Sequence, residues 1–183
     1  MHRMTRRLVA EFFGTFMLVF FGAGAMMTTN FPKADFGLLG IALAHGIALA
    51  VGMTATMAIS GGHLNPAITA GMLAIRRIDA KSALMYIMTQ LLGAVAAAVV
   101  LKMVIPSGVT SVLALGTPSI AATITLGKAI AIEAILTFFL MSAFLGTTVS
   151  SEGTKVAGFG VGLTLFIGML FGGTDRKTIE ESA

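Results

Sequence analysis

The residues best suited to chemistry lie in one short segment of the chain. Residues 60–69 read Ser-Gly-Gly-His-Leu-Asn-Pro-Ala-Ile-Thr and separate an apolar run from an apolar stretch that is too short to cross a membrane. Pro66 suits the first turn of a helix, and Asn65 suits its N-cap. The glycines permit an extended backbone with exposed carbonyls, which membrane proteins tolerate only where it is buried in protein or lines a water-filled cavity.

This segment predicts a site that contacts a passing solute without transforming it. The short helix would direct the positive end of its dipole at the cavity, and the Asn65 amide could donate a hydrogen bond there. The alternative is a surface loop with an ordinary helix cap. The apolar segments on both sides disfavour that alternative.

The chain offers little for catalysis. It contains no cysteine, which excludes disulfides, zinc–thiolate sites and cysteine nucleophiles. We find no paired carboxylates, no nucleophile–base set and no phosphate-binding loop, so we expect no catalytic residue, no metal and no cofactor. Glu11 and Glu133 lie inside apolar runs, and we interpret both as scaffold.

Composition indicates the kind of element that must hold this segment. Of 183 residues, 56% are hydrophobic and only 11% are charged, whereas an average soluble domain is about 25% charged. A soluble domain of this length could not hide so much apolar surface. The composition excludes a soluble enzyme, a disordered linker and a nucleic-acid-binding domain. It predicts an all-α membrane protein whose first partner is the lipid bilayer.

Five apolar runs are long enough to cross a bilayer, which takes about 20 residues at 1.5 Å per residue. The runs cover about residues 8–27, 36–59, 82–105, 126–149 and 156–173. The short stretch after Asn65 ends near Ile75 and is expected to re-enter the membrane without crossing it. Residues 106–123 are predicted to be a long uncharged connection, and residues 174–183 a polar tail.

Basic residues favour a multi-pass protein of the cell membrane with its N-terminus in the cytoplasm. This orientation puts seven basic residues inside and five outside, in agreement with the positive-inside rule. The inside set is Arg3, Arg6, Arg7, Arg76, Arg77, Lys81 and Lys155, and the outside set is Lys33, Lys102, Lys128, Arg176 and Lys177.

The second half of the chain repeats part of the first. With an offset of 122 residues and no gaps, Glu11 aligns with Glu133 and Thr15 with Thr137. A shared Glu-x-x-x-Thr-Phe-x-Leu pattern inside an apolar span is hard to obtain by chance, because a carboxylate is costly and rare within a membrane. We therefore interpret the similarity as a duplication.

The repeat defines the domain organisation that we predict. Residues 1–183 form a single membrane domain, with a first repeat at 8–105 that holds three spans and the half-helix. An incomplete second repeat at 124–173 holds two spans. The odd number of spans in the first repeat inverts the second, and inverted repeats usually build a pathway at their interface.

Three motifs resemble the aquaporin and aquaglyceroporin (major intrinsic protein) family. Residues 63–69, His-Leu-Asn-Pro-Ala-Ile-Thr, resemble its first NPA box. Residues 10–15, Ala-Glu-Phe-Phe-Gly-Thr, resemble its first-helix signature, and residues 132–137 its fourth-helix signature. The match is collinear over residues 8–173. It implies an aquaporin-like inverted repeat, with about five transmembrane helices and one re-entrant half-helix in this chain.

The resemblance also implies roles for individual residues. Asn65 would be a central amide donor, with Pro66 and Ala67 at the tip of the half-helix. Glu11 and Glu133 would be buried acceptors that hold re-entrant loops. The carbonyls that line the pore would be those of Gly61, Gly62, His63 and Leu64.

Two further residues would form the outer constriction. His45 lies twenty residues before Asn65, where the family's second helix contributes to this constriction. The offset of 122 carries His45 to Ile167, the fifth-helix position. A His/Ile pair resembles wider family members that admit ammonia or other solutes more than strict water channels. The alternative for His45 is a packed side chain on an apolar face.

Within residues 1–183 the family's second NPA box, the arginine beside it and the sixth helix have no counterpart, so we expect a form truncated before them. Two functions follow. The first is a passive channel for water or a small neutral solute, a homotetramer as is usual in the family. The second is a non-conducting structural or assembly subunit, bound to partner membrane proteins in a larger complex.

Overall fold

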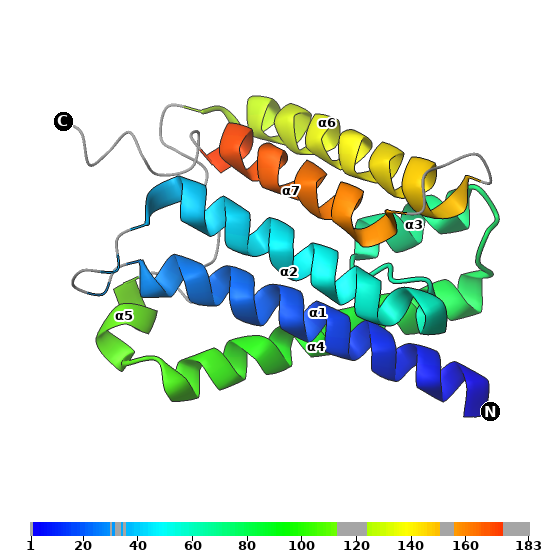
Figure 1. Ribbon diagram of the computed structural model, residues 1–183, viewed down its shortest axis with the longest axis horizontal. Coiled ribbons are helices and arrows are strands. Elements are labelled where there is room, and N and C mark those ends of the chain that lie inside the picture. Colours follow the sequence, from blue (N-terminus) through cyan, green and yellow to red (C-terminus); the bar gives the residue numbers. More distant parts are fainter. Residues whose placement is uncertain are drawn as a thin grey trace.

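A computed structural model describes residues 2–29, 31, 34, 36–112, 124–150 and 156–173. All regular elements in these ranges are helices (Figure 1), which confirms the all-α prediction. Four of the described helical segments are long and apolar enough to cross a membrane, and Gly158–Gly172 is a shorter apolar helix. The four long segments are α1 (His2–Thr28), α2 (Gly37–Ser60), α4 (Ala80–Val104) and α6 (Leu126–Phe144) with η2 (Leu145–Val149), and the shorter helix is α7 (Ala157–Gly173).

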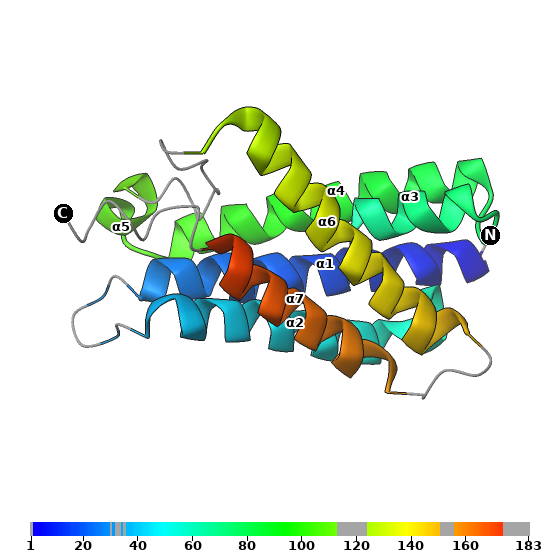
Figure 2. The same ribbon diagram turned by 90° about the horizontal axis from the view of Figure 1, so that it is seen from above.

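The short apolar stretch is a helix of its own. α3 (Pro66–Ala74) has nine residues and is therefore only about 14 Å long, less than half of the ~30 Å hydrocarbon core. It lies between α4 and α6 (Figure 2). The predicted half-helix is thus present, and it returns the chain to the end of the molecule where α1 begins.

Close backbone contacts order the first three long helices. α1 lies between α2 and α4 (Figures 1 and 2). A Cβ atom built on Gly93 of α4 would lie 2.6 Å from the backbone oxygen of Phe12 in α1. At the far end of α1, a Cβ on Gly22 would lie 2.5 Å from the ring of His45 in α2. Glycine at both positions therefore lets the helices approach closely, as small residues do in membrane bundles.

The two halves of the chain meet where α2 crosses α7. A Cβ on Gly162 would lie 2.4 Å from the backbone oxygen of Gly46, and one on Gly158 would lie 2.5 Å from that of Ala50. Because the later residues of α2 face the earlier residues of α7, the two helices run antiparallel. Any larger residue at these glycines would force the two helices apart.

The apolar core joins elements from both halves around the half-helix. Its buried members are Leu49, Met53, Leu64, Ile68, Leu140, Phe144 and Val161. They come from α2, the loop before α3, α3 itself, α6 and α7. The short helix is thus held by packing on both sides.

Several boundaries differ from those predicted. Residues 106–123 are not all connection, because Ser107–Val112 forms the short helix α5. α4 begins at Ala80, since the Asp79 carboxylate accepts a hydrogen bond from Ser82 N at 3.0 Å and caps the helix. The fourth span has its predicted bounds, and its last turn is the π-helix η2. The remaining predictions for residues 113–123, 151–155 and 174–183 lie outside the described residues.

Candidate functional site

The N-terminus of α3 presents a fixed amide. Asn65 has an extended backbone (φ −148°, ψ 127°), and its Oδ1 accepts a hydrogen bond from Ala67 N at 2.7 Å. Pro66 follows in the first turn. Oδ1 is thus engaged, and none of the described residues accepts a hydrogen bond from the Nδ2 group. Asn65 is half-buried, whereas Ala67 is exposed.

The loop that leads to Asn65 needs its glycines. Gly61 and Gly62 have φ angles of 94° and 64°, in the left-handed region that glycine adopts without steric cost. Leu64 also has a positive φ, 49°, which is unfavourable for a side chain with a Cβ. Its side chain is fully buried against Gly14 of α1, where an added Cβ would lie 2.3 Å from Leu64 Cδ2. Packing therefore holds this strained residue in place.

A carboxylate from α1 holds the same loop. Glu11 is 0% exposed. Its Oε1 accepts hydrogen bonds from Ser60 Oγ at 2.6 Å and His63 N at 3.1 Å. Its Oε2 accepts from Leu64 N at 2.7 Å and Gln90 Nε2 at 2.8 Å. These four bonds fill the acceptor positions of a carboxylate, so Glu11 fixes the loop to α1 and α4 at once.

Gln90 extends the network to the half-helix. Its Nε2 also donates to Thr69 Oγ1 at 3.0 Å, and this hydroxyl lies 3.1 Å from His63 Nδ1 and 3.1 Å from the Asn65 backbone oxygen. The first turn of α3 is therefore tied to α4 through side chains. The position of the Asn65 amide consequently depends on residues of α1, α3 and α4.

Tyr86 fixes the end of α2. Its hydroxyl donates to the Ser60 carbonyl at 2.8 Å. The His63 ring lies edge-on between the rings of Tyr86 and Phe144, with centroid distances of 5.3 and 5.7 Å. The His63 side chain is thus a buried packing element, and only its backbone remains available to a passing solute.

The four carbonyls predicted to line a pore differ in their partners. The Leu64 carbonyl accepts from Thr15 Oγ1 at 3.2 Å. Within the described part of the chain, no group donates to the carbonyls of Gly61, Gly62 or His63. Gly61 is half-buried, and the other two residues are buried. Three successive backbone acceptors are therefore left for something other than the described residues.

Glu133 does not have the environment of Glu11. It lies on α6 and is exposed, as is Thr137, although the repeat aligns them with the buried pair Glu11 and Thr15. The sequence led us to expect two buried acceptors, and the described residues bury one. Burial of Glu11 comes from the loop before α3 and from α4, and none of the described residues covers Glu133 in the same way.

The two residues predicted to form the constriction, His45 and Ile167, lie on α2 and α7, which cross each other. His45 of α2 is half-buried, and its Nδ1 lies 2.8 Å from the Ile41 carbonyl. Its ring packs beside Gly22 of α1, which the packing alternative also predicts. Ile167 of α7 is 60% exposed. Their joint role remains a prediction.

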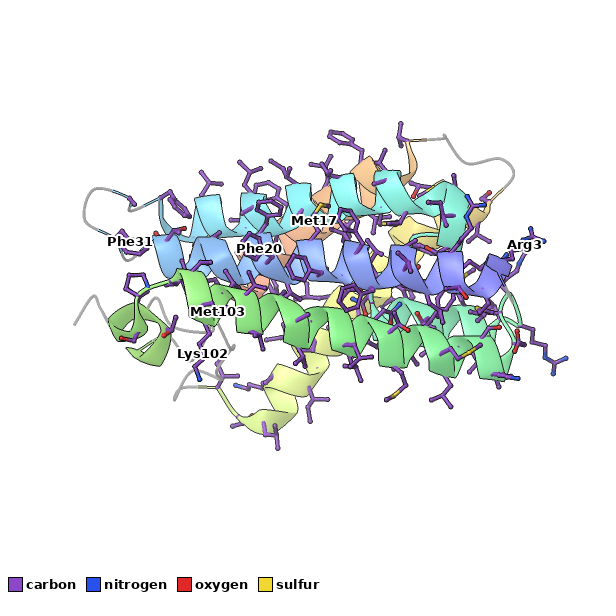
Figure 3. All side chains as sticks on the ribbon, turned by 90° about the horizontal axis from the view of Figure 1, so that it is seen from below. Arg3, Met17, Phe20, Phe31, Lys102 and Met103 are labelled. Atoms are coloured by element: carbon purple, nitrogen blue, oxygen red, sulfur yellow. The ribbon has the colours of Figure 1, made fainter. Side chains whose placement is uncertain are left out.

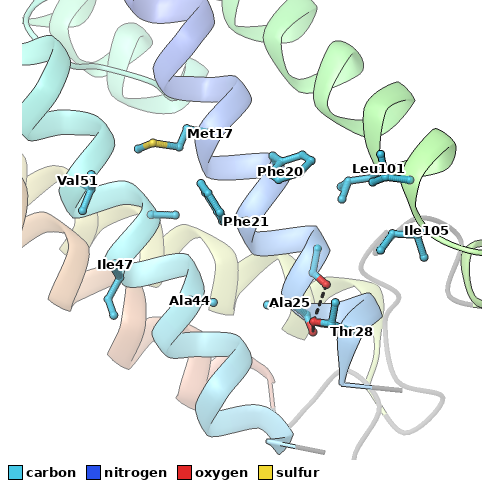
Figure 4. A pocket seen from close by; sticks show the side chains of 13 residues that line it. Met17, Phe20, Phe21, Ala25, Thr28, Ala44, Ile47, Val51, Leu101 and Ile105 are labelled. Atoms are coloured by element: carbon cyan, nitrogen blue, oxygen red, sulfur yellow. Dashed lines mark hydrogen bonds between the residues drawn. The ribbon is translucent and has the colours of Figure 1, made fainter. Parts of the chain in front are cut away.

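An apolar groove is lined by neither of these two residues. It has a volume of about 490 Å³, and Phe20, Phe21, Ile47, Val51 and Leu101 are among its lining side chains (Figure 4). These belong to α1, α2 and α4. The groove contains none of the predicted pore residues and has the character of a surface that faces hydrocarbon.

Four residues of the network were not identified from the sequence as site residues: Ser60, Thr69, Tyr86 and Gln90. A signal for two of them is nevertheless present. Gln90 is a polar residue inside an apolar span, where unpaired polar groups are costly. Tyr86 is the only tyrosine and lies four residues before Gln90, on the same helix face.

Comparison with known proteins identifies the family. The sequence profile of the family described as Major intrinsic protein matches residues 1–176. The chain belongs to the major intrinsic protein family. One member, the glycerol uptake facilitator protein-like 6 of Lactiplantibacillus plantarum, is 40% identical over 164 residues, which are 87% of this chain and 72% of that protein. Aquaporin Z of Brucella melitensis is 40% identical over 171 residues, 88% of this chain and 75% of that protein.

A solved structure supports the same assignment. The aquaglyceroporin from Plasmodium falciparum superposes with a TM-score of 0.79 at 27% identity, covering 93% of this chain and 74% of that one. The family resemblance and the aquaporin-like fold are therefore confirmed. Membership of the major intrinsic protein family also confirms a passive membrane channel at the level of class, and it separates the chain from enzymes.

Proposed function

We propose that the chain provides a passive pathway for water or a small neutral solute along the loop before α3. In this proposal the solute contacts the carbonyls of Gly61, Gly62 and His63 and the amide of Asn65. Pro66 and Ala67 form the tip of the half-helix that supports this amide.

The observation that carries the proposal is the set of carbonyls without a donor. Buried backbone acceptors in native proteins are nearly always paired with backbone, side chains or ordered water. Here three consecutive carbonyls have no partner among the described residues. Irregular backbone persists at membrane depth where it is buried in protein or lines a water-filled cavity, and carbonyls without a protein donor favour the cavity. Water is the partner that best fits carbonyls to which no described residue donates.

Asn65 supplies the complementary donor. Its Oδ1 is held by Ala67 N, so a passing oxygen atom meets Nδ2. The amide lies at the N-terminus of α3, where the helix dipole adds a partial positive charge. A neutral molecule can exchange hydrogen bonds between the carbonyls and this amide, whereas a cation would meet the positive end of the dipole. Filters of this type are known in aquaporins.

The choice of solute rests on the constriction. The matched relatives are named as aquaporins and as a glycerol uptake facilitator, which places water and glycerol among the solutes to test. We assign His45 and Ile167 to the constriction, where an imidazole and an aliphatic side chain would pass small polar solutes besides water.

Orientation and assembly belong to the same proposal. The basic residues near the start of α1 support an N-terminus in the cytoplasm, and we propose that the protein lies in the cell membrane. The exposed apolar side chains of α2 and α6, such as Leu43, Ile47 and Phe138, fit either lipid or the neighbouring subunits of a homotetramer. Native mass spectrometry in mild detergent distinguishes a tetramer from a monomer.

A structural subunit is the second candidate, and the surface of α6 favours it. Glu133 and Thr137 are exposed on one face of this helix. A carboxylate at membrane depth usually faces protein or a water-filled cavity, so this face suits contact with another membrane protein. A partner that copurifies in fixed ratio would support this candidate, and a homotetramer alone would count against it.

Stopped-flow light scattering on proteoliposomes tests the proposal. We expect vesicles that contain the chain to shrink faster than empty vesicles in an osmotic gradient, and to take up glycerol or urea faster. In His45→Phe, a bulkier ring should slow solute uptake more than water flow. Permeability equal to that of empty vesicles for every solute would overturn the channel proposal.

A further inference from the structure

Six basic residues gather at one end of the molecule, which we call the basic end. They are Arg3, Arg6, Arg7, Arg76, Arg77 and Lys81. The first three lie in α1, and the others lie between α3 and the first turn of α4. The start of α1 and the turn between α3 and α4 lie at the same end of the molecule in both ribbon views (Figures 1 and 2). Five of the six side chains are exposed, and Arg7 is half-buried.

The basic end carries little compensating charge. Among the described residues there, Asp79 accepts hydrogen bonds at its two oxygens from Ser82 N and Ser82 Oγ. Glu11, one helical turn after Arg7 on α1, is fully buried and accepts four hydrogen bonds. The opposite end has two described lysines, Lys102 and Lys128, and Figure 3 shows Lys102 at the far end from Arg3.

Helix length places these charges at headgroup depth. α1 has 27 residues and is therefore about 40 Å long, against ~30 Å of hydrocarbon. The apolar part of α1 begins near Leu8, so the turns that bear Arg3, Arg6 and Arg7 extend past the hydrocarbon. The α3–α4 turn lies at the same end of the molecule. The basic end therefore lies at the depth of the lipid phosphates.

Arg76 occupies a backbone position in this turn where glycine is usually preferred. Arg77 N donates to the Met72 carbonyl and Arg76 N to the Leu73 carbonyl, both at 2.9 Å. This pair of bonds is the Schellman motif that ends many helices, and its left-handed position usually holds glycine. Here Arg76 occupies that position with φ 58°. A strained residue at a special position points to a function that outweighs the strain.

We propose that the basic end is a binding surface for anionic phospholipid headgroups. The basic end provides guanidinium groups on two separate segments. A guanidinium group can form two parallel hydrogen bonds to the oxygens of one phosphate. Each basic residue near an anionic bilayer surface strengthens binding about fivefold. Arg76 and Arg77 follow the C-terminus of α3, whose N-terminus is capped by Asn65. A bound headgroup therefore also anchors the C-terminal end of α3. This proposal requires only that the chain is a membrane protein, so it does not depend on whether the chain conducts.

Lipid-selective quenching of a single tryptophan tests the site. The chain has no tryptophan, so Leu84→Trp in α4 gives one reporter near the basic end and Met103→Trp gives one near the opposite end. Leu84 is 61% exposed and Met103 is 79% exposed. Each variant is reconstituted in vesicles of equal parts phosphatidylglycerol and phosphatidylcholine, with one or the other lipid brominated.

We expect Leu84→Trp to report a preference for phosphatidylglycerol of about fivefold or more, and Met103→Trp a preference near one. Adding Arg76→Gln, Arg77→Gln and Lys81→Gln removes three of the six basic residues and should lower the Leu84→Trp preference several-fold. Adding Lys102→Gln and Lys128→Gln should leave it unchanged. Equal preference at both reporters, or a Leu84→Trp preference that the first three substitutions do not lower, would overturn the proposal.

Two controls separate lost binding from lost folding. Quenching in brominated phosphatidylcholine alone reports how far the Leu84→Trp indole contacts lipid, and it should be the same with and without the charge substitutions. The pair Arg76→Lys and Arg77→Lys keeps the charge and should retain most of the preference. A full loss in that pair, with unchanged control quenching, would contradict a site built on charge.

Discussion

Replacing Glu11 with glutamine tests the clamp that holds the loop before α3. The substitution keeps the size of the side chain and replaces one carboxylate oxygen by an NH₂ group. The native carboxylate accepts four hydrogen bonds, two at each oxygen. Glutamine offers a single acceptor atom, so half of these donors must face an NH₂ group.

The cost follows from which donors can adapt. If the amide oxygen stays with Ser60 and His63, Gln90 can reverse its own amide, but the backbone N–H of Leu64 cannot move away. In the other orientation the Ser60 hydroxyl can rotate, but the backbone N–H of His63 cannot. At least one buried N–H is left without an acceptor, which costs about 1–3 kcal/mol of unfolding free energy.

Reversible unfolding by SDS in mixed micelles, followed by far-ultraviolet circular dichroism, measures this loss. Glu133→Gln is the matched control, because the repeat pairs it with Glu11 although it is exposed. We expect it to change the unfolding free energy by less than about 0.5 kcal/mol. A Glu11→Gln variant as stable as wild type, or a larger loss in Glu133→Gln, would refute the reasoning.

Three further substitutions probe the loop and its surroundings. Gly14→Ala should destabilise the protein by about 1–3 kcal/mol in the same assay, because the new Cβ would lie 2.3 Å from Leu64 Cδ2; no loss would show that Leu64 moves freely. Arg76→Gly should stabilise it by about 1 kcal/mol, since glycine adopts a positive φ without cost, and a destabilised variant would contradict this. Hydrogen bonds from Ser82 lower the pKa of Asp79, so its contribution to stability is present above about pH 4 and is lost as pH falls through the lowered pKa. Asp79→Asn should lack this component in unfolding curves recorded from pH 6 to pH 3, and identical pH profiles would show that the cap does not titrate.

The half-helix could be predicted because its signals are local. Asn65 and Pro66 are a helix cap and a first-turn residue by their own chemistry, and the stretch after them is too short to span. The long helices follow from apolar run length alone. For α4 the predicted start was two residues late, because the capping role of Asp79 depends on a hydrogen bond to Ser82 that hydropathy does not register.

The network around Glu11 could be predicted only in part. The sequence marks Glu11 as costly in a membrane, but the partner Gln90 lies 79 residues away, and nothing local indicates which face of α4 meets α1. The exposure of Glu133 shows the same limit. The repeat places Glu11 and Glu133 at equivalent positions of two different helices. Whether each is buried depends on what packs against it.

Osmotic permeability per protein copy, compared between the wild-type chain and Asn65→Asp, tests the central claim most directly. Aspartate keeps an oxygen that can accept from Ala67 N and cap α3, but it replaces the Nδ2 donor by a second oxygen. The account predicts that wild-type vesicles conduct water and that Asn65→Asp vesicles, with equal helix content, fall to the level of empty vesicles. Equal permeability in the two proteins would contradict a pathway that passes the Asn65 amide.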